Sequence, residues 1–431
     1  MQYYSLNKKA PNVSFKDAVV KGLAPDKGLY FPESITPLSE DFFNNIETLS
    51  TTEIAYQVIK QFVGDEIPEN DLKSIIEDTL SFDFPVVPIN ETISTLELFH
   101  GPTMAFKDVG ARFMARCFGY FNKDKATTKV TVLVATSGDT GGAVASGFFG
   151  VEGIDVVILY PSGKVSDVQE KQLTTLGKNI KALEVNGTFD DCQTMVKTAF
   201  LDEELTSQRN LTSANSINVA RWLPQMFYFF FAYKQLKDKN KDLVFSIPSG
   251  NFGNICAGIM AQQLGLPVKQ FIASTNANNI VPNYLETGIY TPKPSKQTIS
   301  NAMDVGDPSN FIRIQEIYGT DTKLKKHLTS YSFSDDETRE AMLEIKNNSG
   351  YIADPHGAVG YLGLKKYLSN HKAQGIFLET AHPVKFLDVV EPVLNETIKY
   401  PQQILNVIDK EKKSINISTY QELKEYLVST K

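Results

Sequence analysis

Short, almost wholly apolar segments alternate with helix-length stretches along most of this chain. Strands that are buried on both faces of a sheet have continuous apolar sequences of this kind, whereas half-exposed strands alternate apolar with polar residues. Strand, turn and helix in rotation predict an α/β fold with doubly wound, open parallel sheets. The strands are expected at 130–135 (VTVLVA), 154–160 (IDVVILY), 180–185 (IKALEV), 243–247 (LVFSI), 268–273 (VKQFIA) and 376–378 (IFL), and the main helices at 167–176, 190–205 and 253–264.

The first 95 residues differ from this pattern and predict an N-terminal, mainly helical cap. Helical stretches occupy 52–62 and 69–80, with few strand signals between them. We expect a smaller α/β domain over 96–215, of which 96–115 can equally pack with the other domain, and a large α/β domain over 216–431. Two further segments stand out: 274–310, rich in Asn, Thr and Pro, is expected to be irregular, and the tail 407–431 combines a charged run with a short amphipathic helix.

The composition excludes several classes of protein. With 431 residues, 42% of them hydrophobic, the chain has enough apolar material for a large core and is neither disordered nor collagen-like. A net charge of −7 argues against a general nucleic-acid binder. The apolar run 226–233 (MFYFFFAY) is far shorter than the roughly 20 residues that span a bilayer. The beginning of the chain lacks the basic and apolar segments of a signal peptide.

The cysteines and histidines give no metal or redox motif. Cys117, Cys192 and Cys256 stand far apart, and the five histidines form no HExxH pattern, so we expect no metal site. Isolated cysteines are typical of small buried side chains in a reducing compartment, which favours a cytoplasmic protein. The chain also lacks GxGxxG, GxxxxGK[ST] and GxSxG, the usual motifs of dinucleotide binding, nucleoside triphosphate binding and nucleophile-elbow hydrolases.

The segment 100–114 (HGPTMAFKDVGARFM) places Lys107 at the start of a predicted helix. The positive end of the helix dipole disfavours a charged amine there, so its pKa should be lowered. Neutral lysine is the form that makes Schiff bases with aldehydes. The same sequence is also compatible with a surface lysine whose stem lies on apolar neighbours.

Two glycine-rich turns each follow a predicted strand and open a helix. They are 135–143 (ATSGDTGGA) and 247–254 (IPSGNFGN). N–H groups at a helix N-terminus bind anions, and we expect those of 137–141 to point at a carboxylate or phosphate. Asp139 would repel such an anion and should point elsewhere. Each turn taken alone is also compatible with an ordinary strand-to-helix connection.

Ligands of open parallel sheets bind at the carboxyl ends of the strands, where these turns are expected to meet. One amine and two anion-binding turns suit an aldehyde that carries a phosphate, together with an anionic substrate. Pyridoxal 5′-phosphate has this combination of groups.

Four segments in this order resemble the threonine synthase family, pyridoxal-phosphate enzymes of the tryptophan-synthase-β-like fold (fold type II). They are 96–108 (LELFHGPTMAFKD), 135–143, 215–225 (NSINVARWLPQ) and 248–254 (PSGNFGN), and the resemblance extends from 22–33 (GLAPDKGLYFPE) to 378–386 (LETAHPVKF). It implies the fold type II architecture with an extended N-terminal region.

The resemblance also implies roles for individual residues. Lys107 would bind the cofactor aldehyde as a Schiff base and then move protons. Asp139 stands where shorter relatives have Asn beside the pyridoxal 3′-oxygen. Thr380 would meet the pyridine nitrogen. The phosphate of the cofactor would lie on Gly250, Asn251, Phe252, Gly253 and Asn254, and the substrate on Thr103, Ser137, Thr140, Asn215 and Arg221. Arg221 could instead form a structural ion pair.

The activity that the resemblance implies is conversion of O-phospho-L-homoserine and water to L-threonine and phosphate, the last step of threonine biosynthesis. Three alternatives stay open: a phospho-lyase of the same fold that yields 2-oxobutyrate, a dehydratase or β-replacement enzyme acting on serine-like substrates, and a cofactor-binding protein without catalysis. The expected partners are the small-molecule substrate alone, without nucleic acid or membrane, and the chain is expected to be a monomer or homodimer.

Overall fold

The smaller of two parallel sheets contains three of the predicted strands at their predicted positions. The computed structural model describes residues 1–123, 129–236 and 238–430. Within this part of the chain the sheet has the strand order β14-β8-β7-β6-β9, with every neighbouring pair parallel. The strands are β6 (Val130–Ala135), β7 (Ile154–Pro161), β8 (Ile180–Val185), β9 (Asn210–Thr212) and β14 (Ser414–Ile417).

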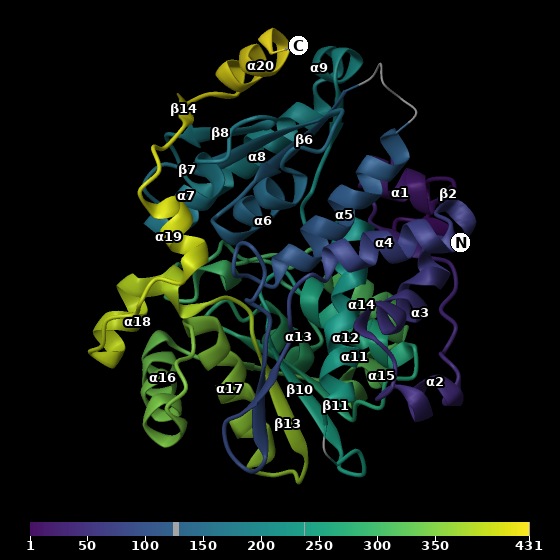
Figure 1. Cartoon of the computed structure of the whole chain (residues 1–431), viewed down its shortest axis with the longest axis vertical. Coiled ribbons are helices and arrows are strands. Elements are labelled where there is room, and N and C mark those ends of the chain that lie inside the picture. The colour runs from purple at the N-terminus through teal and green to yellow at the C-terminus, as the bar shows by residue number, and fades with distance from the viewer. Residues whose placement is uncertain (124–128, 237, 431) are drawn as a thin grey trace.

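The larger sheet has the order β12-β11-β10-β13-β5-β4 among the described residues. Its strands run parallel except β4, which pairs antiparallel with β5 at the edge. Figure 1 shows the two sheets one above the other. The strands are β4 (Val86–Pro88), β5 (Ile93–Glu97), β10 (Leu243–Pro248), β11 (Gln270–Thr275), β12 (Leu328–Ser332) and β13 (Gln374–Glu379).

Both sheets are buried on both faces, as the continuous apolar strands predict. In β6, Val132 and Val134 join one hydrophobic cluster while Leu133 joins another on the opposite face. In β10, Val244 and Phe245 divide between two clusters in the same way. Successive side chains of a strand point to opposite faces, so helices must cover each side. The α/β prediction is confirmed.

Helices connect the strands and carry the segments of interest. α17 packs against β10, β11 and β13, and α8 packs against β6 and β7. From the first sheet onward the helices are α5 (Lys107–Asn122), α6 (Asp139–Phe148), α7 (Asp167–Thr174), α8 (Phe189–Leu201), α9 (Glu203–Gln208), α10 (Val219–Trp222), η2 (Leu223–Met226), α11 (Phe227–Lys234), α12 (Gly253–Gln263), α13 (Ile280–Thr287), η3 (Asn301–Met303), α14 (Phe311–Tyr318), α15 (Asp321–His327), α16 (Asp335–Ser349), α17 (Pro355–Leu368), η4 (Pro383–Phe386), α18 (Leu387–Leu394), α19 (Gln402–Ile408) and α20 (Tyr420–Ser429).

The N-terminal cap contains a small sheet that the sequence did not predict. Its strands are only two to four residues long, too short to show a period-two pattern. The hydroxyl of Tyr3 donates to the carbonyl of Phe62 at 2.7 Å, which joins this sheet to the helices. The cap comprises β1 (Gln2–Ser5), β2 (Val13–Ser14), α1 (Phe15–Lys21), β3 (Tyr30–Pro32), α2 (Glu40–Asn45), α3 (Thr51–Val63), η1 (Gly64–Glu66) and α4 (Glu69–Thr79).

Strand pairing crosses the expected domain boundaries. β5 spans the boundary expected between residues 95 and 96 and lies in the larger sheet. β14 and α20, expected in the large domain, complete the smaller sheet because Ile417, Leu423 and Leu427 bury their side chains in its core. In Figure 1 the yellow C-terminal chain runs from one sheet to the other. Residues 124–128, 237 and 431 fall inside the expected ranges but outside the described residues.

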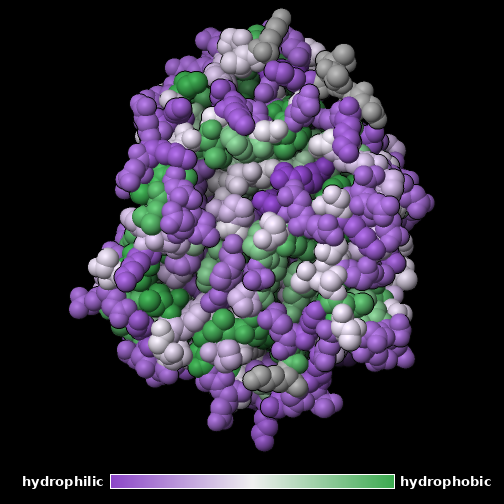
Figure 2. Space-filling model, in the orientation of Figure 1, coloured by the Kyte–Doolittle hydropathy of each residue, from purple (hydrophilic) through white to green (hydrophobic). Residues whose placement is uncertain are grey.

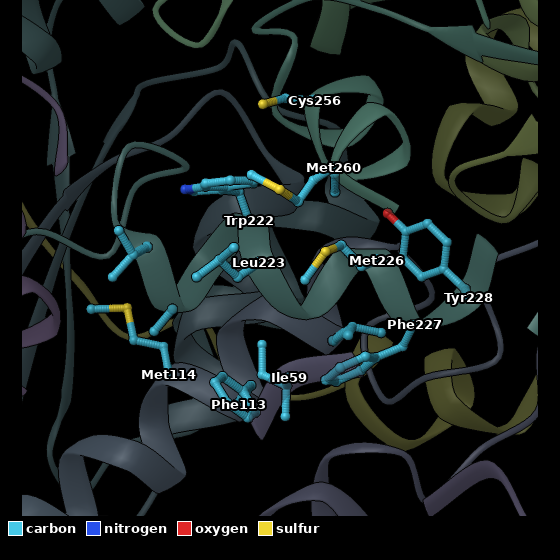
Figure 3. Close-up of a cluster of buried hydrophobic side chains, with 14 of the residues drawn as sticks. Ile59, Phe113, Met114, Trp222, Leu223, Met226, Phe227, Tyr228, Cys256 and Met260 are labelled. Carbon is cyan, nitrogen blue, oxygen red and sulfur yellow. The ribbon is translucent and has the colours of Figure 1, made fainter. Parts of the chain in front are cut away.

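The segment expected to be irregular, 274–310, contains α13 and η3 as well as loop. The aromatic run 226–233 is buried on all sides rather than amphipathic. Figure 3 shows Met226 and Phe227 among Ile59 of the cap, Phe113 of α5 and Met260 of α12. This cluster therefore packs together the cap, the helix that begins with Lys107 and the helix that follows the turn 247–254.

The face shown in Figure 2 is mainly hydrophilic, and its hydrophobic residues form separate groups. Among the described residues, no helix combines the length and hydropathy needed to cross a membrane. The same residues contain no group of three or more His, Cys, Asp and Glu side chains that could hold a metal ion.

Candidate active site

Lys107 is the first residue of α5, as predicted, and lies beside the end of β13. The backbone N–H of Phe106 donates to the carbonyl of Thr380 at 2.8 Å, and Ala105 and Ala381 form an isolated antiparallel bridge. These contacts join residues far apart in sequence. The structure thus brings together Lys107 and Thr380, two of the predicted site residues.

The surroundings of the Lys107 amine lower its pKa. Burial lowers its pKa most, the carboxylate of Asp139 raises it, and the cations of Lys385 and Arg221 lower it further. The net direction is downward. A lysine with a lowered pKa is a better nucleophile near neutral pH than an ordinary surface lysine.

The turn 250–254, which is expected to hold the cofactor phosphate and is called the cup below, leads into α12 as predicted. A Cβ built on Gly250 would lie 2.7 Å from Cα of Met303, so only glycine fits at this close approach of two backbone segments. Phe252 has a left-handed backbone, with φ of 60°. α12 begins at Gly253, so its first N–H groups lie at the turn.

Side chains from other segments hold the cup in place. The amide of Asn251 donates to Oγ of Ser216 at 2.7 Å, and its oxygen accepts from the N–H of Ser309 at 2.6 Å. The amide oxygen of Asn254 accepts from the hydroxyl of Tyr228 at 2.7 Å. The side-chain nitrogen of Asn254 is buried without a partner in the described structure. A bound group would satisfy this donor, because buried polar atoms are normally paired.

The second turn, 135–143, differs from prediction in its N–H groups. The hydroxyl oxygen of Thr136 accepts from the N–H of Gly138 at 3.0 Å and from that of Gly141 at 2.8 Å. The expectation that all five N–H groups of 137–141 point at a ligand is therefore wrong for these two. Within the described residues, no hydrogen bond of the turn uses the N–H groups of Ser137, Asp139 or Thr140.

Asp139 is buried at the start of α6, and its carboxylate contacts side chains of other segments. Its Oδ1 lies 2.6 Å from Nζ of Lys385 and accepts from the amide of Gln169 at 3.0 Å. Burial alone would raise the pKa of Asp139, but the cations of Lys385 and Lys107 hold it well below its usual value. The carboxylate is therefore ionised.

Thr103 is buried before α5, and its hydroxyl proton is already in use. Its hydroxyl donates to one oxygen of Asp108 at 2.6 Å, and its N–H donates to the other at 2.9 Å. Burial raises the pKa of Asp108, while these two hydrogen bonds lower it. In this arrangement the Thr103 hydroxyl cannot donate to the substrate carboxylate.

Arg221 lies in α10, buried against α5. Its guanidinium donates to the carbonyl of Ala214, and burial lowers its pKa to about 10 while the charge of Asp108 raises it. A Cβ at Gly110 would lie 2.2 Å from the carbonyl oxygen of Arg221, so α5 and α10 touch through backbone. Asn215 accepts through its carbonyl from the N–H of Asn218 at 3.1 Å. Contacts of Arg221 and Asn215 with a substrate phosphate stay a prediction.

Lys385 was not predicted as a site residue, although it lies in the segment 378–386. A lysine between two apolar residues, Val384 and Phe386, is a signal that could have identified it. A buried cluster around Glu379, the residue before Thr380, was also not predicted. Glu379 accepts from the N–H of Asp354, and Asp354 accepts from Nδ1 of His356 at 2.5 Å. Burial and the charge of Asp354 raise the pKa of Glu379 well above its usual value.

His382, two residues after Thr380, should make stability depend on pH. Its Nδ1 accepts from the N–H of Val384 at 3.0 Å, and burial lowers its pKa to about 4. A histidine that is neutral in the folded protein makes its full contribution to stability above its pKa in the unfolded chain, about 6.5. This contribution is lost as the pH falls towards the pKa of the histidine in the folded protein. We expect the free energy of unfolding to fall by about 1–3 kcal/mol over this window.

Urea unfolding of His382→Asn at pH 7 and pH 5 tests this expectation. Asn can still cap the N–H of Val384 but does not titrate. The variant should lose part of the pH dependence, and His371→Asn, which removes an exposed histidine, should keep it. If the free energy of unfolding of His382→Asn depends on pH as strongly as that of the wild type, the attribution of this pH dependence to His382 is contradicted.

Three family matches cover most of the chain. Residues 94–377 match the family described as pyridoxal-phosphate dependent enzyme, residues 2–80 match threonine synthase N terminus, and residues 357–427 match threonine synthase, C-terminal. The threonine synthase of Buchnera aphidicola subsp. Baizongia pistaciae is 43% identical over 99% of this chain and 100% of its own length.

Solved structures agree with these matches. The crystal structure of threonine synthase from Escherichia coli is 42% identical, with a TM-score of 0.94 over 100% of both chains. A pyridoxal-phosphate-bound threonine synthase from Brucella melitensis is 33% identical, with a TM-score of 0.93 over 99% of this chain and 98% of the other.

Proposed function

Because the chain belongs to the threonine synthase family of pyridoxal-phosphate-dependent enzymes, we propose that it converts O-phospho-L-homoserine and water to L-threonine and inorganic phosphate. The observation that carries the proposal is the joining of Lys107 to the end of β13 by the hydrogen bond from Phe106 to Thr380. This contact sets an amine of lowered pKa beside the residue expected at the pyridine nitrogen.

The residues of the site fit pyridoxal phosphate. Gly250 lies against the backbone of Met303, where no side chain fits, and the buried side-chain nitrogen of Asn254 is a donor without a partner. Helix α12 adds its N–H groups and positive dipole end, which suit a phosphate. When bound, the cofactor supplies a ring that stabilises the negative charge developing at Cα of the substrate.

Lys107 would hold the cofactor and then serve as the base. Its lowered pKa leaves an amine able to take a proton from Cα of the substrate and to return one later. Loss of a proton from Cβ and departure of phosphate from Cγ would follow, a proton would add at Cγ to form the methyl group, and water would add at Cβ. The water supplies the hydroxyl of threonine, so the atoms of substrate and products balance.

A net charge of −7 does not prevent the chain from binding an anionic substrate, because positively charged groups gather at the site. Lys385 and the guanidinium of Arg221 lie close enough to Lys107 for their charges to lower its pKa. The N–H groups of Ser137 and Thr140 and the start of α12 add local positive potential. We therefore propose that the substrate carboxylate lies at the turn 137–140 and its phosphate near Arg221.

The products of one incubation test the proposal. With O-phospho-L-homoserine as substrate, threonine and phosphate should form in equal amounts. Phosphate together with 2-oxobutyrate in place of threonine would instead favour the phospho-lyase. Turnover of serine but not of the phosphorylated substrate would favour a dehydratase.

The cell compartment is a separate expectation. All three cysteines are buried and unpaired, which agrees with the reducing cytoplasm favoured by their spacing.

A further inference from the structure

Lys385 is a fully buried lysine at the centre of contacts between three segments. It lies on η4, its ammonium is 2.6 Å from Oδ1 of Asp139 in α6, and it donates to the carbonyl of Thr103 at 2.8 Å. A buried ammonium loses its hydration and is retained only where it is paired and hydrogen-bonded. Here one carboxylate and one carbonyl provide that compensation.

The contact links the two sheets. Asp139 follows β6 of the smaller sheet, while η4 follows β13 of the larger one. Gln169 of α7 donates to the same oxygen of Asp139, and Gln172, one turn later on α7, donates to the carbonyl of Thr103 at 3.1 Å. Lys385 and α7 therefore hold the same two acceptors, which fixes the direction of the Asp139 carboxylate.

The Lys107 amine is the group whose charge depends on this arrangement. The carboxylate of Asp139 favours protonated Lys107, whereas the cations of Lys385 and Arg221 favour the neutral amine. Asp108 faces Arg221 from α5 and is the other carboxyl group nearby. Without Lys385, Lys107 would be the remaining lysine whose charge acts on Asp139, and the attraction between them would raise the pKa of Lys107.

We propose that Lys385 is a positioning residue that keeps Asp139 paired and directed, so that Lys107 remains available to react with an aldehyde. Lys385 thus acts through Asp139 and is not assigned a contact with substrate. The inference rests on the proposed function, in which Lys107 is the amine that binds pyridoxal phosphate.

The test measures the pH dependence of Lys107 labelling. The full chain, stripped of cofactor with hydroxylamine, is treated with pyridoxal phosphate between pH 6 and pH 10, and the product is reduced with borohydride and located by peptide mass. Lys385→Met should raise the midpoint of labelling by about one pH unit, which is about tenfold slower labelling below the midpoint. Lys365→Met, at an exposed lysine paired with Glu344, should leave it unchanged.

Two further variants separate charge compensation from a merely structural role. Asp139→Asn should shift the midpoint in the opposite direction, to lower pH. Because Lys385 acts through Asp139, the double variant Lys385→Met/Asp139→Asn should have the same midpoint as Asp139→Asn. A midpoint that does not move in Lys385→Met overturns the inference, and so does a double variant whose midpoint differs from that of Asp139→Asn. If Lys385→Met does not fold, the comparison of the double variant with Asp139→Asn decides: equal midpoints support the inference, and different midpoints overturn it.

If the proposed function is wrong, the labelling experiment gives a different result. In that case the wild-type chain itself takes no label at Lys107, and the inference falls with it. If the wild type is labelled at Lys107 and the variants have the same labelling midpoint as the wild type, only the role of Lys385 is contradicted.

Discussion

Lys107→Ala is expected to lower turnover of O-phospho-L-homoserine by at least about a thousandfold and to abolish the visible absorbance of bound pyridoxal phosphate. Alanine removes both the amine that holds the cofactor and the base that moves the proton at Cα. Lys107→Arg should fail equally, because a guanidinium keeps the positive charge but does not deprotonate. This pair of variants distinguishes the reactivity of the amine from its charge.

Lys123→Ala is the matched control, since this exposed lysine follows the last residue of the same helix. It should keep both absorbance and turnover. The measurements are the absorbance spectrum of the purified protein and phosphate release under saturating substrate. A Lys107→Ala protein that kept either property would contradict the assignment of Lys107.

Gly250→Ala is expected to weaken pyridoxal phosphate binding by about tenfold to a hundredfold, or about 1–3 kcal/mol. The added Cβ would lie 2.7 Å from Cα of Met303 and 3.0 Å from the carbonyl oxygen of Ala302. Both are backbone atoms, which cannot swing aside as the end of a side chain can. Either the cup or the segment 302–303 must shift, and the N–H groups of the cup lose their alignment.

Equilibrium titration of the cofactor-free chain with pyridoxal phosphate measures this effect. Gly119→Ala is the control, because its Cβ would find only Cγ1 of Val151 at 3.5 Å and its backbone is helical. That substitution should leave binding unchanged and add up to about 1 kcal/mol of stability. Wild-type affinity in Gly250→Ala would show that the close approach at Met303 is unimportant for the cup.

The sequence predicted the strands in which consecutive residues are mostly apolar and buried. β6 and β8 begin and end where predicted because nearly every residue contacts one of two hydrophobic clusters. β14 could not be predicted, since its four residues are mostly exposed and only Ile417 is buried. What makes it a strand is the free edge of β8, a tertiary feature.

The site shows the same division between local and long-range information. The cup at 250–254 and the position of Lys107 follow from glycine spacing and from a helix start, which are local. The partners that hold them are not local: Asn251 depends on Ser216 and Ser309, and Asp139 depends on Lys385. No spacing rule connects such residues, because the topology of the two sheets decides which segments meet.

The pairing of β14 with β8 has a consequence for biosynthesis. The ribosome releases the N-terminus first, so β6, β7 and β8 emerge long before the strand that covers the edge of β8. Until β14 has left the ribosome, that edge presents unpaired N–H and C=O groups, the type of surface that promotes association between chains. The smaller sheet can therefore reach its final form only after β14 has emerged, whereas β5, β10, β11, β12 and β13 of the larger sheet can pair before β14 is made.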